Sequence, residues 1–209
     1  MPMPGGWTMS MAWMRMPGQT WPGAAAGFLA MWAVMMVAMM LPSLMPVLLR
    51  HRRPVRVAGG YYAVWISAGA AIYPLGIAVA ACEMRWPAVA RLVPLATGFA
   101  IAAAGIVQLT RWKTRALERC RDPACCAIGR RPGPRQAWRD GRSLGLHCTT
   151  CCAAPIAVLL VTGVMDLVAM VVIAVAITAE RLAPWPRVVS RAFGVCALAV
   201  GAVLVAVAP

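Results

Sequence analysis

Long stretches of this chain carry almost no charge, and they limit the possible fold more than any other feature of the sequence. Six apolar runs cover residues 23–49, 57–82, 92–110, 143–164, 167–182 and 192–208. A helix needs about 20 such residues to cross the hydrocarbon core of a bilayer. The runs are continuously apolar, whereas strands of a membrane β-barrel alternate polar and apolar residues. The sequence therefore predicts an all-α polytopic membrane helix bundle with about six transmembrane helices.

Composition and charge exclude most other classes of protein. Hydrophobic residues make up 62% of the chain and charged residues only 12%, about half the charged share of an ordinary soluble domain. The net charge of +14 would suit a nucleic-acid binder, but ten of the twenty basic residues lie between Arg111 and Arg142, and four lie between Arg50 and Arg56. Both groups flank apolar runs, as in cytoplasmic loops that face anionic lipid. We therefore expect the lipid bilayer, and no nucleic acid, as a partner.

The same basic residues predict the orientation of the chain. They follow the first and third apolar runs, and Arg181, Arg187 and Arg191 lie around the link after the fifth. These three links should therefore be cytoplasmic, and both termini should lie outside. Residues 1–22, rich in Met and Trp, are then an extracytoplasmic tail. Residues 23–209 form one six-helix membrane domain with a basic cytoplasmic loop at 111–142.

Methionine is concentrated at the start of the chain. Twelve of the fifteen methionines fall within the first 45 residues. In the first run, residues spaced by four share a helical face, which predicts one thioether-rich stripe beside Trp32: Met31, Met35, Met36, Met39 and Met40. Thioether sulfur is a soft ligand that selects Cu(I) and needs no deprotonation. Ordinary helix packing is the alternative, because Met is also an adaptable apolar residue.

A second group of soft donors opens the fourth run. His147, Cys148, Cys151 and Cys152 read H-C-T-T-C-C, and their spacings of three and four place them on one side of a helix. We expect this segment at the N-terminal end of its helix, where the helix dipole favours thiolates. Thiolate and imidazole together suit Cu(I), or Zn(II) as the alternative metal. Close packing of small cysteine side chains is the non-metal alternative.

Further residues near these runs have less specific patterns. Cys120, Cys125 and Cys126 lie in the preceding basic segment and either complete the site or remain free thiols. Asp166 follows the fourth run and is expected to form a turn. Glu180, near the cytoplasmic face beside Arg181, is expected to form a salt bridge or an interfacial anchor.

Two motifs together resemble those of a bacterial family of unknown function, described as predicted metal-binding integral membrane proteins. The first reads M-W-A-V-M-M-V-A-M-M-L-P-S from Met31 to Ser43, and the second is the C-T-T-C-C run from Cys148 to Cys152 after Gly145. The resemblance extends in order to about Pro184. It implies a multi-span membrane fold and metal binding. His147 departs from the family pattern, where an aromatic residue is usual.

These patterns favour one function and leave two alternative functions open. We expect an integral membrane protein of the bacterial inner membrane that handles copper, with a metallochaperone or a larger membrane complex as partner. The first rival is a noncatalytic assembly or structural subunit whose Met and Cys residues serve packing. The second is a membrane redox enzyme that uses Cys151 and Cys152. Because the sequence lacks the usual catalytic motifs, we favour a binding protein over an enzyme.

Overall fold

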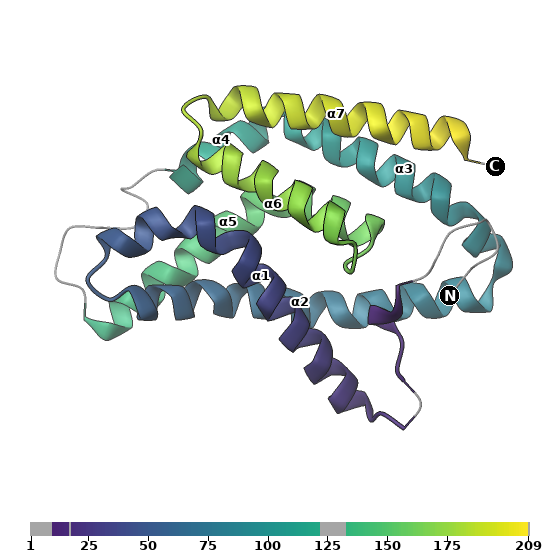
Figure 1. The fold of residues 1–209 in the computed structure, drawn as a ribbon, viewed down its shortest axis with the longest axis horizontal. Coiled ribbons are helices and arrows are strands. Elements are labelled where there is room, and N and C mark those ends of the chain that lie inside the picture. Colours follow the sequence, from purple (N-terminus) through teal and green to yellow (C-terminus); the bar gives the residue numbers. More distant parts are fainter. Residues whose placement is uncertain (1–9, 17, 122–132, 209) are drawn as a thin grey trace.

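The protein is a bundle of helices joined mostly by short links (Figure 1). The computed structural model describes residues 10–16, 18–121 and 133–208. A short 3-10 turn at Met11–Trp13 precedes the α-helices, which are α1 Trp21–Arg50, α2 Pro54–Arg85, α3 Pro87–Leu109, α4 Arg111–Arg121, α5 Pro134–Thr162, α6 Leu167–Leu182 and α7 Pro186–Val207. No strand occurs in the described ranges, which confirms the all-α prediction. Cys125 and Cys126 lie outside the described residues.

Prolines and one aspartate set where most of the helices begin. Helices α2, α3, α5 and α7 each begin at a proline, which is tolerated because the first-turn N–H has no partner within the helix. At the start of α6, a carboxylate oxygen of Asp166 accepts hydrogen bonds from the amides of Val168 and Ala169, at 2.9 and 3.1 Å. This N-cap confirms the turn role expected of Asp166.

Five helices are long and apolar enough to cross a membrane: α1, α2, α3, α5 and α7. Helix α6 is apolar but has only 16 residues, about 24 Å at 1.5 Å per residue, which is less than a hydrocarbon core of about 30 Å. Large apolar side chains such as Val34, Leu75 and Val171 are exposed on the outside of the bundle, as lipid-facing helices require. The structure therefore supports a polytopic membrane protein, and the fifth predicted run forms a helix that is short for a crossing.

The basic links gather at one end of the bundle. Figure 1 shows the α1–α2 link, the start of α5 and the α6–α7 link at the left, and the α2–α3 link and the end of α7 at the right. The predicted basic loop at 111–142 is helical over much of its described length, since it contains α4 and the first residues of α5. The basic residues of this segment that the structure describes are therefore carried on helices.

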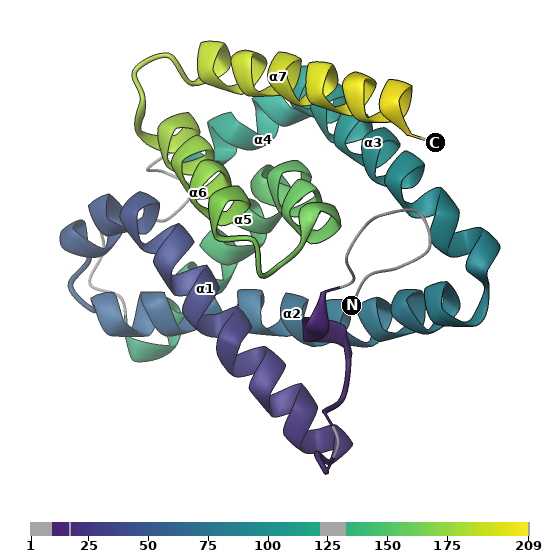
Figure 2. The ribbon, with the colours of Figure 1, turned by 45° about the vertical axis from the view of Figure 1, so that its right-hand side comes forward.

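Helix α5 lies at the centre and contacts α2, α3, α4 and α6 (Figure 2). Its backbone approaches α2 closely because Gly141 faces it: a Cβ on Gly141 would lie 2.1 Å from the carbonyl oxygen of Val57. Glycine at such a seam lets two membrane helices pack at short range. Tyr61, one turn beyond Val57 on α2, reaches Cys148, two turns beyond Gly141 on α5.

Candidate metal centre

Sulfur atoms from three helices meet in the core. Cys148, Cys151 and Cys152 of α5 are at most 1% exposed, and they share one core cluster with Cys120 of α4 and Met40 of α1. The Cys148 Sγ atom lies 3.7 Å from Cys152 Sγ and 4.0 Å from Met40 Sδ. The structure thus brings together donors that are more than 100 residues apart along the chain.

The spacing of these sulfurs is compatible with a shared soft cation. Two sulfurs bound to one metal at about 2.3 Å lie roughly 3.7 to 4.6 Å apart, from tetrahedral to linear geometry. Both distances from Cys148 fall in this range. Within the described residues, no group of three or more His, Cys, Asp or Glu side chains is already arranged to hold a metal ion. The donor chemistry fits a soft metal, and side-chain rotation would be needed to close a coordination sphere.

The methionine stripe of α1 lies against the same cluster. Met35, Met36, Met39 and Met40 are buried in the core, and Met31 is half-buried and packs against it. The predicted shared face is therefore present. Of these thioethers, the one shown beside the cysteine helix is Met40, whose Sδ atom lies 4.0 Å from Cys148 Sγ.

The place of the cysteines within their helix differs from expectation. The His147 side chain is half-buried, and because it comes one residue before Cys148, it is turned about 100° around the helix from that cysteine. The cysteines were expected at a helix N-terminus, but α5 begins at Pro134, fourteen residues before Cys148. A dipole effect fades within the first turn, so it does not act on these thiols.

Two donors converge on the Cys148 sulfur. The Tyr61 hydroxyl donates to Cys148 Sγ at 3.0 Å, and the Arg181 guanidinium donates to it at 3.4 Å. Arg181 also donates to Ser43 Oγ at 3.0 Å. The Cys148 sulfur is therefore held between a phenol of α2 and a cation of α6.

A second polar network lies beside Cys151. Pro155 has no N–H, so the Cys151 carbonyl lacks its usual helical donor, and Lys113 Nζ donates to it at 2.7 Å. Lys113 also forms an ion pair with Glu180 at 2.7 Å, and both side chains are at most 2% exposed. The amide of Gln108 donates to the other carboxylate oxygen of Glu180 at 2.7 Å.

The salt bridge expected of Glu180 is therefore present, but its partner is Lys113 of α4. Glu180 and Arg181 are neighbours in the sequence, and neighbouring side chains on a helix point about 100° apart. Each consequently reaches a different part of the core: Glu180 faces Lys113, and Arg181 faces Cys148.

The surroundings shift the pKa of two groups on α4. Hydrogen bonding to the Cys148 and Cys151 sulfurs raises the pKa of the Cys120 thiol, and burial raises it further. Burial lowers the pKa of Lys113, but negative charge at Cys151 and Glu180 outweighs this effect and raises it overall. Cys120 is therefore a neutral thiol donor, and Lys113 keeps its positive charge.

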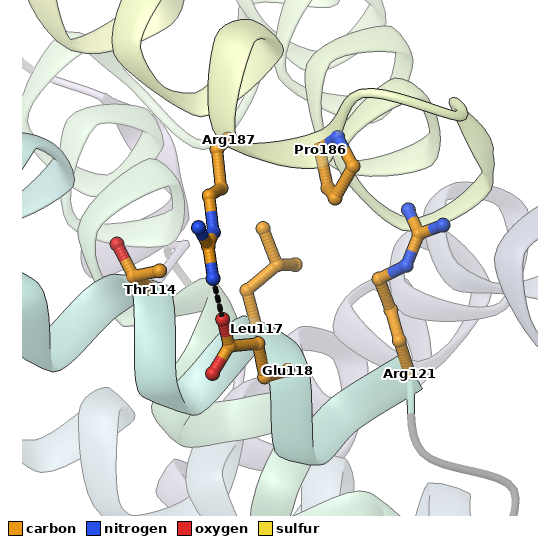
Figure 3. Close-up of a pocket in the computed structure, with 6 residues that line it drawn as sticks. All are labelled: Thr114, Leu117, Glu118, Arg121, Pro186 and Arg187. Atoms are coloured by element: carbon orange, nitrogen blue, oxygen red, sulfur yellow. Dashed lines mark hydrogen bonds and ion pairs between the residues drawn. The ribbon is translucent and has the colours of Figure 1, made fainter.

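A surface pocket of about 350 Å³ lies outside the cluster, between α4 and the start of α7. Figure 3 shows Glu118 and Arg187 joined by an ion pair, with Pro186 and Arg121 nearby. Leu117 lines this pocket and also packs in the core cluster that contains Cys120. The Leu117 side chain thus has the sulfur cluster on one side and the surface on the other.

Comparison with known families identifies the chain's relatives. A family model described as PpoB2, copper chaperone, matches residues 29–204. The chain belongs to the PpoB2 copper chaperone family. The PpoB2 match includes every predicted metal ligand, from Met31 to Cys152, and it supports the copper-related part of the predicted function. No curated protein and no solved structure matches the chain.

Several polar residues of the candidate site were not predicted as part of it. Lys113 and Arg181 lie within the range of the family resemblance, and the charge of Arg181 at the end of an apolar run was a usable signal. Tyr61 and Ser43 had no distinguishing pattern, because their roles depend on which helices become neighbours.

Proposed function

We propose that this protein carries Cu(I) as cargo, binding it at the buried sulfur cluster and transferring it across or within the bacterial inner membrane. One observation supports this most directly: the Cys152 thiol of the same helix and the Met40 thioether of α1 both lie within 4.0 Å of Cys148 Sγ. Thiol and thioether sulfur select Cu(I) over hard cations. Membership in a copper chaperone family favours copper over zinc.

The α1 methionine stripe suggests the direction of transfer. Thioethers bind Cu(I) without losing a proton, so they can pass it along a low-dielectric helix face. Thiolates bind it more tightly, so transfer from Met35 and Met39 through Met40 to Cys148 would be downhill. In the topology proposed next, this path leads inward from the outer side.

We further propose that the basic links face the cytoplasm and that α6, although short, counts as a crossing. This gives six crossings with both termini outside. Support comes from the positive residues of the α1–α2 link, of α4, and of the helix ends that flank the α6–α7 link, where Arg181, Arg187 and Arg191 lie. They follow the usual excess of Lys and Arg on the cytoplasmic side.

A soluble metallochaperone or a larger membrane complex would exchange copper at the cytoplasmic end. The pocket beside Leu117 is the proposed place, because one side chain separates it from the core cluster of Cys120. Leu117→Trp should then slow Cu(I) transfer to an added thiol acceptor while leaving the bound stoichiometry unchanged. An unchanged rate would place the exchange elsewhere.

The decisive experiment is Cu(I) binding by protein purified in detergent under reducing conditions. Cys148→Ser combined with Cys151→Ser should abolish bound Cu(I), whereas Cys82→Ser combined with Cys196→Ser should not, because those two thiols are exposed and outside the cluster. Unchanged stoichiometry in the first variant would refute the site. Uptake of copper into vesicles that contain the protein would show that it is a carrier, whereas a protein that only binds copper would give no uptake. A wild-type protein that functions without metal would favour the assembly-subunit alternative.

A further inference from the structure

Arg181 is a buried cation without a carboxylate partner in the described part of the chain. Its residue is 7% exposed, and the ion pairs found there join Lys113 to Glu180, Arg187 to Glu118 and His51 to Asp140. The guanidinium is directed instead at Cys148 Sγ and Ser43 Oγ. A buried charge is costly unless an opposite charge compensates it.

The neighbouring charges leave Arg181 as the excess positive group of the site. Lys113 and Glu180 neutralise each other at 2.7 Å. Tyr61 contributes a hydrogen bond to Cys148 but no charge. The groups able to balance Arg181 are therefore the cysteine sulfurs beside it, once a metal has replaced their protons.

We propose that Arg181 is the fixed counter-charge of the metal-bound thiolates and gives the site its preference for a monovalent over a divalent soft cation. This inference rests on the proposed copper function. Two thiolates with one Cu(I) carry a single negative charge, which Arg181 neutralises. Two thiolates with one Zn(II) are already neutral, so the charge of Arg181 would remain uncompensated in a low-dielectric core.

The test compares affinities for Cu(I) and Zn(II), each measured by competition with a chelator, in the full-length protein and four variants. Arg181→Lys keeps the charge and should retain the preference for Cu(I). Arg181→Gln keeps hydrogen-bond donors without the charge and should lower the preference for Cu(I) over Zn(II) about tenfold or more. Arg181→Met should do the same and provides a second neutral variant in case one fails to fold. Arg187→Met, which removes an exposed arginine, is the matched control and should change neither affinity.

The outcomes separate this inference from the function on which it rests. If the wild-type protein binds no Cu(I), the proposed function fails, and this inference fails with it. If the wild-type protein binds Cu(I) and the neutral variants keep the wild-type preference for Cu(I) over Zn(II), only the role of Arg181 is refuted. If Arg181 only stabilises the fold, the neutral variants should bind Cu(I) and Zn(II) more weakly by the same factor, and that result would also contradict the proposal.

Discussion

Pro155 lies one helical turn beyond Cys151 and leaves the carbonyl of Cys151 without its helical hydrogen bond. Lys113 Nζ takes that acceptor at 2.7 Å, so a missing backbone donor on α5 is matched by a side chain from α4. We expect Pro155→Ala to restore the helical N–H and compete with Lys113. In a double-mutant cycle, Lys113→Met should therefore cost about 1 kcal/mol less free energy of unfolding in the Pro155→Ala background than in the wild type.

Lys113→Met also removes the ion pair with Glu180. Because it does so in both backgrounds, this loss cancels when the two changes in unfolding free energy are compared. Unfolding monitored by circular dichroism in mixed micelles provides the measurement. Additive effects of the two substitutions would show that Lys113 does not replace the missing donor.

Breaking the buried ion pair of Lys113 and Glu180 should lower the free energy of unfolding far more than breaking the surface pair of Glu118 and Arg187. Glu180→Gln leaves a buried ammonium without its counter-ion and should cost about 3–5 kcal/mol of unfolding free energy. Glu118→Gln breaks an ion pair whose side chains are more than half exposed, so it should cost less than about 1 kcal/mol. Equal losses in the two variants would contradict the burial argument.

The close approach of α2 and α5 predicts a strong effect at Gly141. Because a Cβ there would lie 2.1 Å from the Val57 carbonyl oxygen, Gly141→Ala should force the helices apart and cost about 1–3 kcal/mol or more. Gly27→Ala is the matched control, since its Cβ meets nothing within 4 Å and alanine favours the helix. Thermal unfolding of both variants in detergent tests this, and a stable Gly141→Ala protein would refute it.

Copper binding should strengthen as the pH rises if Cys120 joins the site. The raised pKa of Cys120 means that its thiol stays protonated near neutral pH and that a metal must displace this proton. Raising the pH removes the competing proton, so the dissociation constant should fall by up to about tenfold per pH unit for each proton released. Competition titrations between about pH 6 and 8 measure the slope. Cys120→Ser should reduce it, and an unchanged slope would exclude Cys120 as a ligand.

The two possible topologies differ at the chain ends. With six crossings, reporters fused to the N- and C-termini should both appear outside, whereas five crossings would place them on opposite sides. We expect both outside, because α6 is apolar from Leu167 to Ile177 and its C-terminal end lies beside the basic residues Arg187 and Arg191 of α7. Accessibility of an introduced cysteine at Met165 to a membrane-impermeant reagent provides an independent check on the α5–α6 turn.

Periodicity and apolar runs in the sequence were enough to predict the apolar helices and the donors that share one helix, but not α4, which lies in the segment predicted as a basic loop. The run predicted at 167–182 coincides with α6, and the spacing of Met35, Met39, Cys148 and Cys152 placed each pair on one face, because helical periodicity is a local property. The helix N-terminus predicted near Cys148 was wrong, since polar and basic residues from Pro134 onward extend α5 without adding apolar character.

Only the tertiary structure decided which donors meet. Cys148 meets Tyr61 across 87 residues of chain and Met40 across 108, and Glu180 turns to Lys113 while its neighbour Arg181 turns to Cys148. These pairings depend on how closely and at what angle helices pack. Small contact residues such as Gly141 control that approach, and no periodicity within a single helix reveals it.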